Sequence, residues 1–206
     1  MPVVQSFEGP GVHWIRFYHK EDKTRLVKIF AGAEQPASGD IFIGELNVRE
    51  LSPHNLSQLL YVYSDYFVLT GDTVLQMACP KKDNSLRKKA SRLLKRIQEV
   101  HPAISLPSGN SRTGRLAMPL TASQKAILRW VNMLCCPKPL LIVDEPFEHF
   151  NREDRPYWIK KLQQLGKTSN ILVLSAHKPP ARLHPDTYDE WPTPRSSQAT
   201  NSGGAA

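Results

Sequence analysis

Apolar positions along this chain recur with the spacing of strands in some segments and of helices in others. Four consecutive apolar residues at 140–143 lie between prolines and predict a buried strand. A second apolar run at 171–174 predicts another strand, and residues 12–18, which alternate between apolar and polar side chains, predict a third. Buried strands separated by helical segments are typical of an α/β fold with a mainly parallel sheet flanked by helices.

The helical segments are recognised by apolar residues three and four positions apart. Residues 85–100 form an amphipathic pattern whose apolar stripe consists of Leu86, Ala90, Leu93, Leu94, Ile97 and Val100. A second helix begins at Thr121 or Ser123, either of which could cap it, and runs to about Leu134. Residues 19–23 predict a charged loop. Residues 24–31 then predict a helix that ends at Gly32, and residues 155–165 predict another.

Weaker patterns fill the interval between the first predicted helix and the amphipathic one. Residues 41–43 predict a short strand that continues through 46–51, beyond Gly44. Residues 55–60 predict a short helix and 61–63 a strand. We therefore expect one α/β domain over residues 1–180.

Two further regions complete the predicted organisation. A helical lobe is expected at about residues 73–135. Proline, serine and glycine are frequent in residues 181–206, which predicts a largely disordered tail.

Composition narrows the class of protein. The chain has 206 residues, of which 40% are hydrophobic, and no apolar run approaches the roughly 20 residues of a membrane-spanning helix. We expect no signal peptide, and we expect a cytoplasmic protein with reduced cysteines, because three cysteines fit no disulfide framework. The net charge of +8 is compatible with nucleic acid, an anionic membrane surface or a basic solvated face. For the basic residues at 81–96 a solvated helix face is the favoured interpretation.

Three polar side chains follow the two best predicted strands. Asp144 and Glu145 come directly after residues 140–143, and His177 comes shortly after 171–174. The carboxyl ends of parallel strands meet at one edge of the sheet, where α/β proteins place their ligand chemistry. Two carboxylates and a histidine at that edge are typical of phosphate hydrolysis.

Five segments occur in an order known from one protein family. They are residues 26–32 (LVKIFAG), 35–41 (QPASGDI), 47–51 (NVREL), 61–71 (YVYSDYFVLTG) and 120–124 (LTASQ). Together with the Asp144 strand and His177, they resemble the nucleotide-binding domain of ABC transporters of the exporter and type I secretion kind. The resemblance covers about residues 4–180 and implies a P-loop NTPase-like cassette whose N-terminal strand region is truncated.

The resemblance implies a role for each matching residue. Asp144 would hold Mg²⁺ through water, Glu145 would polarise the attacking water, and His177 would sense the γ-phosphate. Lys23 would contact the phosphates of ATP and Thr24 would contact both phosphate and Mg²⁺.

The signature segment of the family contacts the nucleotide held by a second cassette. Here Ser123 and Gln124 occupy that segment, 20 residues before Asp144. The resemblance therefore also implies a homodimer or heterodimer with another cassette.

Departures from the family pattern concentrate at the phosphate loop. The family has G-x-x-G-x-G-K-[ST], whereas residues 17–24 read FYHKEDKT, which keeps Lys23 and Thr24 but has no glycine. Those glycines adopt positive φ and bring backbone N–H groups onto the phosphates. Two non-glycine residues forced there would cost roughly 2–4 kcal/mol, or about thirty- to several-hundred-fold in affinity. Glu21 and Asp22 add negative charge, so we predict weakened nucleotide binding.

Other departures lie outside that loop. Ser64 stands at the position of the Q-loop glutamine and Asn151 at that of the D-loop aspartate. Ala122 and Ser123 replace the two signature glycines. These changes weaken the expectation of catalysis without altering the predicted fold.

Three functional hypotheses follow. The first is an ATP- and Mg²⁺-dependent subunit that serves a separate membrane-spanning exporter subunit, peripheral at the inner face of the cell membrane. The second is a pseudo-ATPase that acts as a structural or regulatory partner of another cassette. The third, a DNA-associated ABC-type ATPase, is suggested only by charge, and a nucleic-acid partner is disfavoured.

Overall fold

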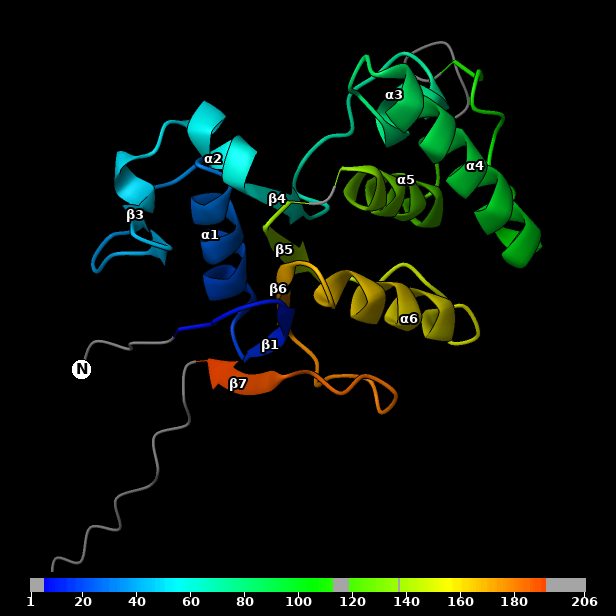
Figure 1. Cartoon of the computed structure of the whole chain (residues 1–206). Coiled ribbons are helices and arrows are strands. Elements are labelled where there is room, and N and C mark those ends of the chain that lie inside the picture. Colours follow the sequence, from blue (N-terminus) through cyan, green and yellow to red (C-terminus); the bar gives the residue numbers. More distant parts are fainter. Residues whose placement is uncertain (1–5, 113–118, 137, 192–206) are drawn as a thin grey trace, which may run out of the picture.

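The central element of the fold is a five-stranded parallel sheet (Figure 1). The structure is a computed structural model that describes residues 6–112, 119–136 and 138–191. Across the sheet, the strands are β4 (Leu60–Tyr63), β5 (Leu140–Asp144), β6 (Asn170–Ser175), β1 (Gly11–Phe17) and β7 (Thr187–Trp191). Every pairing among them is parallel, which confirms the predicted sheet.

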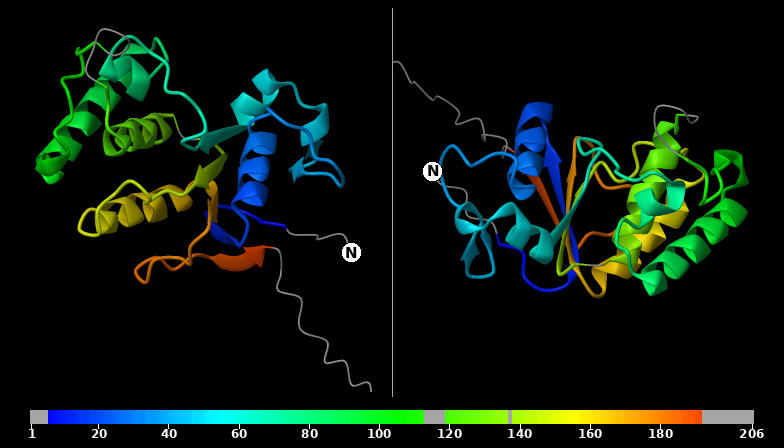
Figure 2. Two further views of the ribbon diagram at one scale, coloured as in Figure 1. Left: turned by 180° about the vertical axis from the view of Figure 1, so that it is seen from behind. Right: turned by 90° about the horizontal axis from the view of Figure 1, so that it is seen from above.

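Helices cover both faces of the sheet (Figure 2). One face carries α1 (Lys20–Phe30) and α2 (Pro53–Leu59). The other carries α5 (Ala122–Cys135) and α6 (Arg155–Gly166), with α3 (Val74–Ala78) and α4 (Asn84–Val100) packed beyond α5. The predicted α/β class is therefore confirmed.

Two apolar cores, one on each face, explain why the central strands are apolar without interruption. Along β5, Leu141 and Val143 pack into the core under α5 and α6, whereas Ile142 packs into the core under α1 and α2. Successive side chains of a strand point to opposite faces, so a strand buried on both faces needs apolar residues at every position. Helices α3, α4 and α5 fall within residues 73–135, and the division of the chain into a core domain and a helical lobe stays a prediction.

Helix α1 begins at Lys20, four residues before the predicted start at residue 24. The prediction of a charged loop before Thr24 is therefore wrong. Lysine, glutamate and aspartate can all continue a helix, and Glu21 and Asp22 lie in the first turn, where negative charge interacts favourably with the helix dipole. Only Tyr18 and His19 separate β1 from α1.

The predicted strand over residues 46–51 is confirmed only for Leu46 and Asn47. Strands β2 (Phe42–Ile43) and β3 (Leu46–Asn47) pair with each other in an antiparallel hairpin that is separate from the main sheet. A 3-10 helix, η1 (Val48–Glu50), follows at once, and the side chain of its N-cap, Asn47, accepts a hydrogen bond from the backbone N–H of Arg49. A second 3-10 helix, η2 (Pro102–Ile104), follows α4.

The predicted tail begins too early, because β7 is an ordered edge strand of the sheet. The backbone of Val12 is held at both groups by Asp186: its N–H donates to Asp186 Oδ2 (2.7 Å) and its C=O accepts from the Asp186 N–H (2.7 Å). An edge strand has one exposed side and need not be apolar, which is why β7 escaped the hydrophobic pattern. Residues 192–206 of the predicted tail lie outside the described residues.

Candidate functional site

Lys23, Asp144 and Glu145 form an ion cluster at the carboxyl edge of the sheet. Lys23 Nζ contacts Asp144 Oδ1 and lies 3.2 Å from Glu145 Oε1. The three side chains are only 6%, 16% and 15% exposed. The structure therefore brings together three of the predicted site residues.

Two serines and one backbone N–H supply the remaining hydrogen bonds of the carboxylates. Ser64 Oγ donates to Asp144 Oδ2 (2.7 Å), and Ser175 Oγ donates to Glu145 Oε2 (2.7 Å). The backbone N–H of Ala176 donates to Glu145 Oε1 (2.6 Å). Every carboxylate oxygen of the pair therefore has a donor from the protein itself.

Neither serine was predicted to join this cluster. Ser64 and Ser175 each stand at a strand end, as Asp144 does, directly after β4 and at the last position of β6. The rule that identified Asp144 could therefore have identified them too.

The charge on Lys23 survives its burial. Burial alone would lower the pKa of its ammonium group, but the hydrogen bond to Asp144 and the charges of Asp144 and Glu145 outweigh it and raise the pKa above its usual value. Lys23 is therefore protonated throughout the neutral range.

The backbone of Glu145 is strained. Its φ of 46° lies in the left-handed region, which costs a non-glycine residue about 1–2 kcal/mol. The three contacts of its carboxylate and the bond from its N–H to the Leu174 carbonyl (3.0 Å) hold it there. Such an outlier at a strand end is a feature of functional sites.

The segment between β1 and α1 does not fit a magnesium–triphosphate group. Its two linking residues and the helical turn that follows leave no glycine-lined loop, and Lys23 turns toward the carboxylates. Thr24 is half-buried, and no described hydrogen bond joins it to Asp144, so the predicted pair of magnesium ligands stays a prediction.

The surface near Thr24 carries no net positive charge. Thr24 borders a hollow of about 500 Å³ whose other lining residues are three basic and three acidic ones: Lys20, Arg25, Lys28, Glu21, Asp22 and Glu34. A highly charged anion would gain little from this balance.

His177 lies near the cluster through its backbone. Its N–H donates to Ser175 Oγ (3.0 Å), and its carbonyl accepts from Trp14 Nε1 (2.9 Å). The residue is exposed, and within the described part of the chain its imidazole forms no hydrogen bond. The predicted γ-phosphate contact of His177 stays a prediction.

Ser123 and Gln124 lie in the first turn of α5, and no described contact joins them to the ion cluster. Thr121 is the N-cap, which decides between the two caps considered. The side chain of Gln124 completes a capping box with Thr121 and donates from Nε2 to the Ser105 carbonyl (2.9 Å). In this chain the amide of Gln124 therefore holds local structure.

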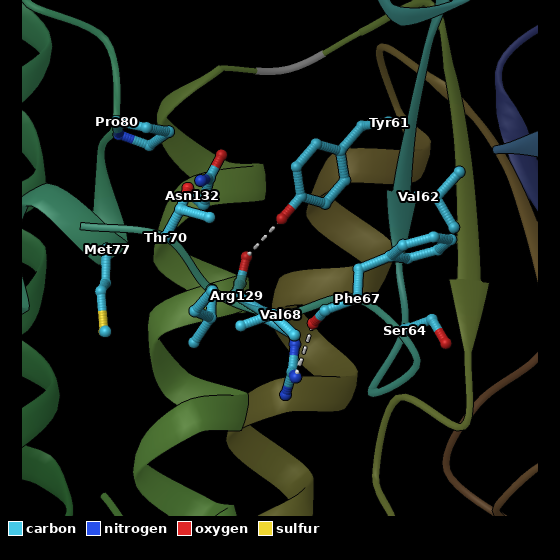
Figure 3. Close-up of a pocket in the computed structure, with 11 residues that line it drawn as sticks. Tyr61, Val62, Ser64, Phe67, Val68, Thr70, Met77, Pro80, Arg129 and Asn132 are labelled. Atoms are coloured by element: carbon cyan, nitrogen blue, oxygen red, sulfur yellow. Dashed lines mark hydrogen bonds between the residues drawn. The ribbon is translucent and has the colours of Figure 1, made fainter. Parts of the chain in front are cut away.

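A small groove of about 130 Å³ lies beside the cluster, between β4, the segment 64–70 and helices α3 and α5 (Figure 3). Arg129 of α5 is buried and anchors this segment: it pairs with Asp65 and donates to the Phe67 carbonyl (3.1 Å). The Tyr61 hydroxyl donates to the Arg129 carbonyl (3.3 Å). Val68, on the rim, is 86% exposed.

Comparisons with known proteins point to one family. The chain is 23% identical over 159 residues to the lactococcin-A transport/processing ATP-binding protein LcnC of Lactococcus lactis. It is 26% identical over 158 residues to the spermidine/putrescine import ATP-binding protein PotA of Legionella pneumophila and 28% identical over 154 residues to the thiamine import ATP-binding protein ThiQ of Aliivibrio fischeri. No protein-family model matches the chain.

A solved structure shows the same architecture. A bacterial Atm1-family ABC exporter with ATP bound superposes on 81% of this chain with a TM-score of 0.68 at 15% sequence identity. The chain has the fold of an ABC transporter ATP-binding cassette. The predicted similarity to ABC transporter ATP-binding proteins is therefore confirmed. The similar proteins include ATP-binding proteins of both import and export systems.

The matched regions give the extent of this similarity. They cover 76%, 74% and 74% of the chain and 22%, 40% and 63% of LcnC, PotA and ThiQ, so the cassette spans less than two thirds of each relative. It also covers 29% of the exporter chain. Among the described helices, none has the length and apolar character needed to cross a bilayer.

Proposed function

We propose that this cassette is a subunit of an ABC-type transporter whose own nucleotide site is closed, and that it acts as a structural or regulatory partner of another cassette. The observation that carries the proposal is the two-residue connection between β1 and α1, which leaves no loop for a triphosphate. ATP and Mg²⁺, if they bind this chain, bind weakly. The pseudo-ATPase hypothesis is thereby preferred to that of a working ATPase.

A membrane-spanning exporter subunit is the partner we propose, reached from the inner face of the cell membrane. The groove beside Arg129 supports this, because its rim presents Val68 and the nearby Tyr66 is 52% exposed. Exposed apolar and aromatic side chains beside a groove are typical of a surface that contacts another protein chain. The relatives LcnC, PotA and ThiQ, which are ATP-binding proteins of import and export systems, support the same assignment.

The catalytic half of the proposal is tested by ATP turnover. We expect the purified cassette to hydrolyse ATP no faster than a buffer control, and we expect Glu145→Gln to leave that rate unchanged. A turnover that Glu145→Gln abolishes would overturn the proposal and identify a working ATPase in which Glu145 polarises the water.

The partner half is tested by association with membranes that contain the exporter subunit. Val68→Asp should release the cassette from these membranes, whereas Tyr188→Ala, which alters an exposed aromatic residue on β7, should not. Equal retention of both variants, or salt-sensitive binding to DNA without membrane association, would contradict the proposed partner.

A further inference from the structure

The ion cluster contains one cation and two anions, and the cation comes from the chain itself. Among the described residues, Lys23 is the one basic side chain that forms an ion pair with Asp144 or Glu145. We infer that its ammonium group takes the position of a bound divalent cation between the two carboxylates. The inference deepens the proposed function, because it names what closes the site.

The oxygens around Lys23 are those that a hard divalent cation prefers. Asp144 and Glu145 each direct one oxygen at Nζ, and the hydroxyls of Ser64 and Ser175 lie on the outer oxygens of the same carboxylates. Carboxylate oxygens are typical ligands of Mg²⁺ and Mn²⁺, and the two serine hydroxyls fix the orientation of these carboxylates. A metal ion and the Lys23 ammonium would compete for the same space.

The added turn of α1 is what carries Lys23 into this position. Because α1 begins at Lys20, Lys23 lies inside the helix, on the buried face that also presents Val27 and Phe30. These positions are four and three residues apart and therefore share one side of the helix. The Lys23 side chain therefore faces the sheet, as do Val27 and Phe30 later in the same helix.

Two opposite charges that are both mostly buried depend on each other. Removal of one partner of such a pair leaves the other charge without compensation. If Lys23 replaces a metal ion, then a metal ion should replace Lys23 when the lysine is shortened. The wild-type protein, by contrast, should not respond to the metal.

The experiment follows the thermal midpoint of the full chain with and without 10 mM MgCl₂ or MnCl₂, in the absence of nucleotide. We expect Lys23→Ala to lower the midpoint by about 6–12 °C and either metal to restore about 4–10 °C of that loss. Wild-type protein should shift by less than about 1 °C. The matched control is Lys20→Ala, which removes an exposed lysine from the same helical turn. Its thermal midpoint should stay near that of wild type, both with and without the metals.

Two results would overturn the inference. One is a Lys23→Ala protein that folds but gains no stability from either metal. The other is a wild-type protein that the metals stabilise in a saturable manner that Asp144→Asn removes, because the metal would then bind beside the lysine and not in its place.

A second variant keeps the test decisive if Lys23→Ala does not fold. Combining Lys23→Ala with Glu145→Gln removes one charge of each sign and should restore folding. A double variant as unfolded as the single one would show that the lysine serves packing, not charge. None of these stability measurements contains nucleotide. Their outcome is therefore independent of the ATP turnover experiment, and either the inference or the proposed function can fail while the other stands.

Discussion

Arg129 should be among the most costly residues to replace outside the ion cluster. Its guanidinium comes from α5, is 9% exposed, and pairs with Asp65 while donating to the Phe67 carbonyl (3.1 Å). Arg129→Met keeps the length and apolar character of the side chain but removes all of these bonds. The segment 64–70 would then lose its anchor on the helix.

The magnitude follows from the exposure of each partner. Asp65 is 47% exposed and keeps a contact with His149, so solvent screening limits the ion pair to about 1 kcal/mol. The hydrogen bond to the Phe67 carbonyl comes from a charged donor and is worth about 1.5–3 kcal/mol. We therefore expect Arg129→Met to cost about 2–4 kcal/mol, or roughly 4–16 °C in the thermal midpoint of a domain of this size.

The assay combines urea denaturation with hydrogen exchange. Denaturation measures the total loss in free energy of unfolding, and exchange shows where protection is lost. Compared with wild type, Arg129→Met should raise the exchange rate in residues 64–70 more than in β6, which lies in the centre of the sheet. The control is Asp65→Asn, which removes the ion pair but keeps the Phe67 contact, and it should cost about 1 kcal/mol or less.

Two outcomes would refute the reasoning. Arg129→Met with wild-type stability would mean that the guanidinium bonds contribute nothing net. A loss of protection spread evenly over β6 and the segment 64–70 would mean that Arg129 supports the whole fold and not the groove.

Three further predictions concern the rest of the molecule. Gly166→Ala should lower the thermal midpoint, because an added Cβ would lie 2.7 Å from Val12 Cγ2; an unchanged midpoint would mean that α6 shifts freely. Burial lowers the pKa of His13 below its usual 6.5 against the charges of Asp186 and Asp189, so the unfolded state binds more protons and stability should fall as the pH drops below about 6.5. Urea titrations at pH 7.5 and 5.5 should show a smaller fall for His13→Gln than for wild type, and equal falls would contradict this. Truncation after residue 191 should move the midpoint by less than about 2 °C, because residues 192–206 contain no large apolar side chain; a larger drop would show that they dock on the domain.

The sequence was sufficient for the elements that bury apolar residues on a regular period. The β5 and β6 strands, α4 and α6 were all predicted within two residues of their observed bounds, because burial on both faces of a sheet or along one face of a helix leaves a strong pattern. The polar edge strand β7 left no such pattern, since its pairing with β1 depends on backbone hydrogen bonds.

The site was predicted in its residue types but not in its contacts. Asp144 and Glu145 were identified from their place after β5, whereas the pairing of Lys23 with both depends on where α1 begins. The match to a phosphate loop led to the prediction of a loop over residues that form a helical turn. Arg129 gave no signal, because a single basic residue in an amphipathic helix does not reveal which distant carbonyl it reaches.

A calorimetric titration of the full chain with Mg·ATP tests most directly whether the nucleotide site is closed. We expect a dissociation constant of about 0.1 mM or weaker, given the thirty- to several-hundred-fold loss that follows from the missing glycines. We also expect Thr24→Ala to leave that weak binding unchanged, because Thr24 has no described contact with Asp144. Binding with a dissociation constant in the low micromolar range, abolished by both Lys23→Ala and Thr24→Ala, would contradict the closed site. It would show that the helical turn at Lys20 opens to admit a nucleotide.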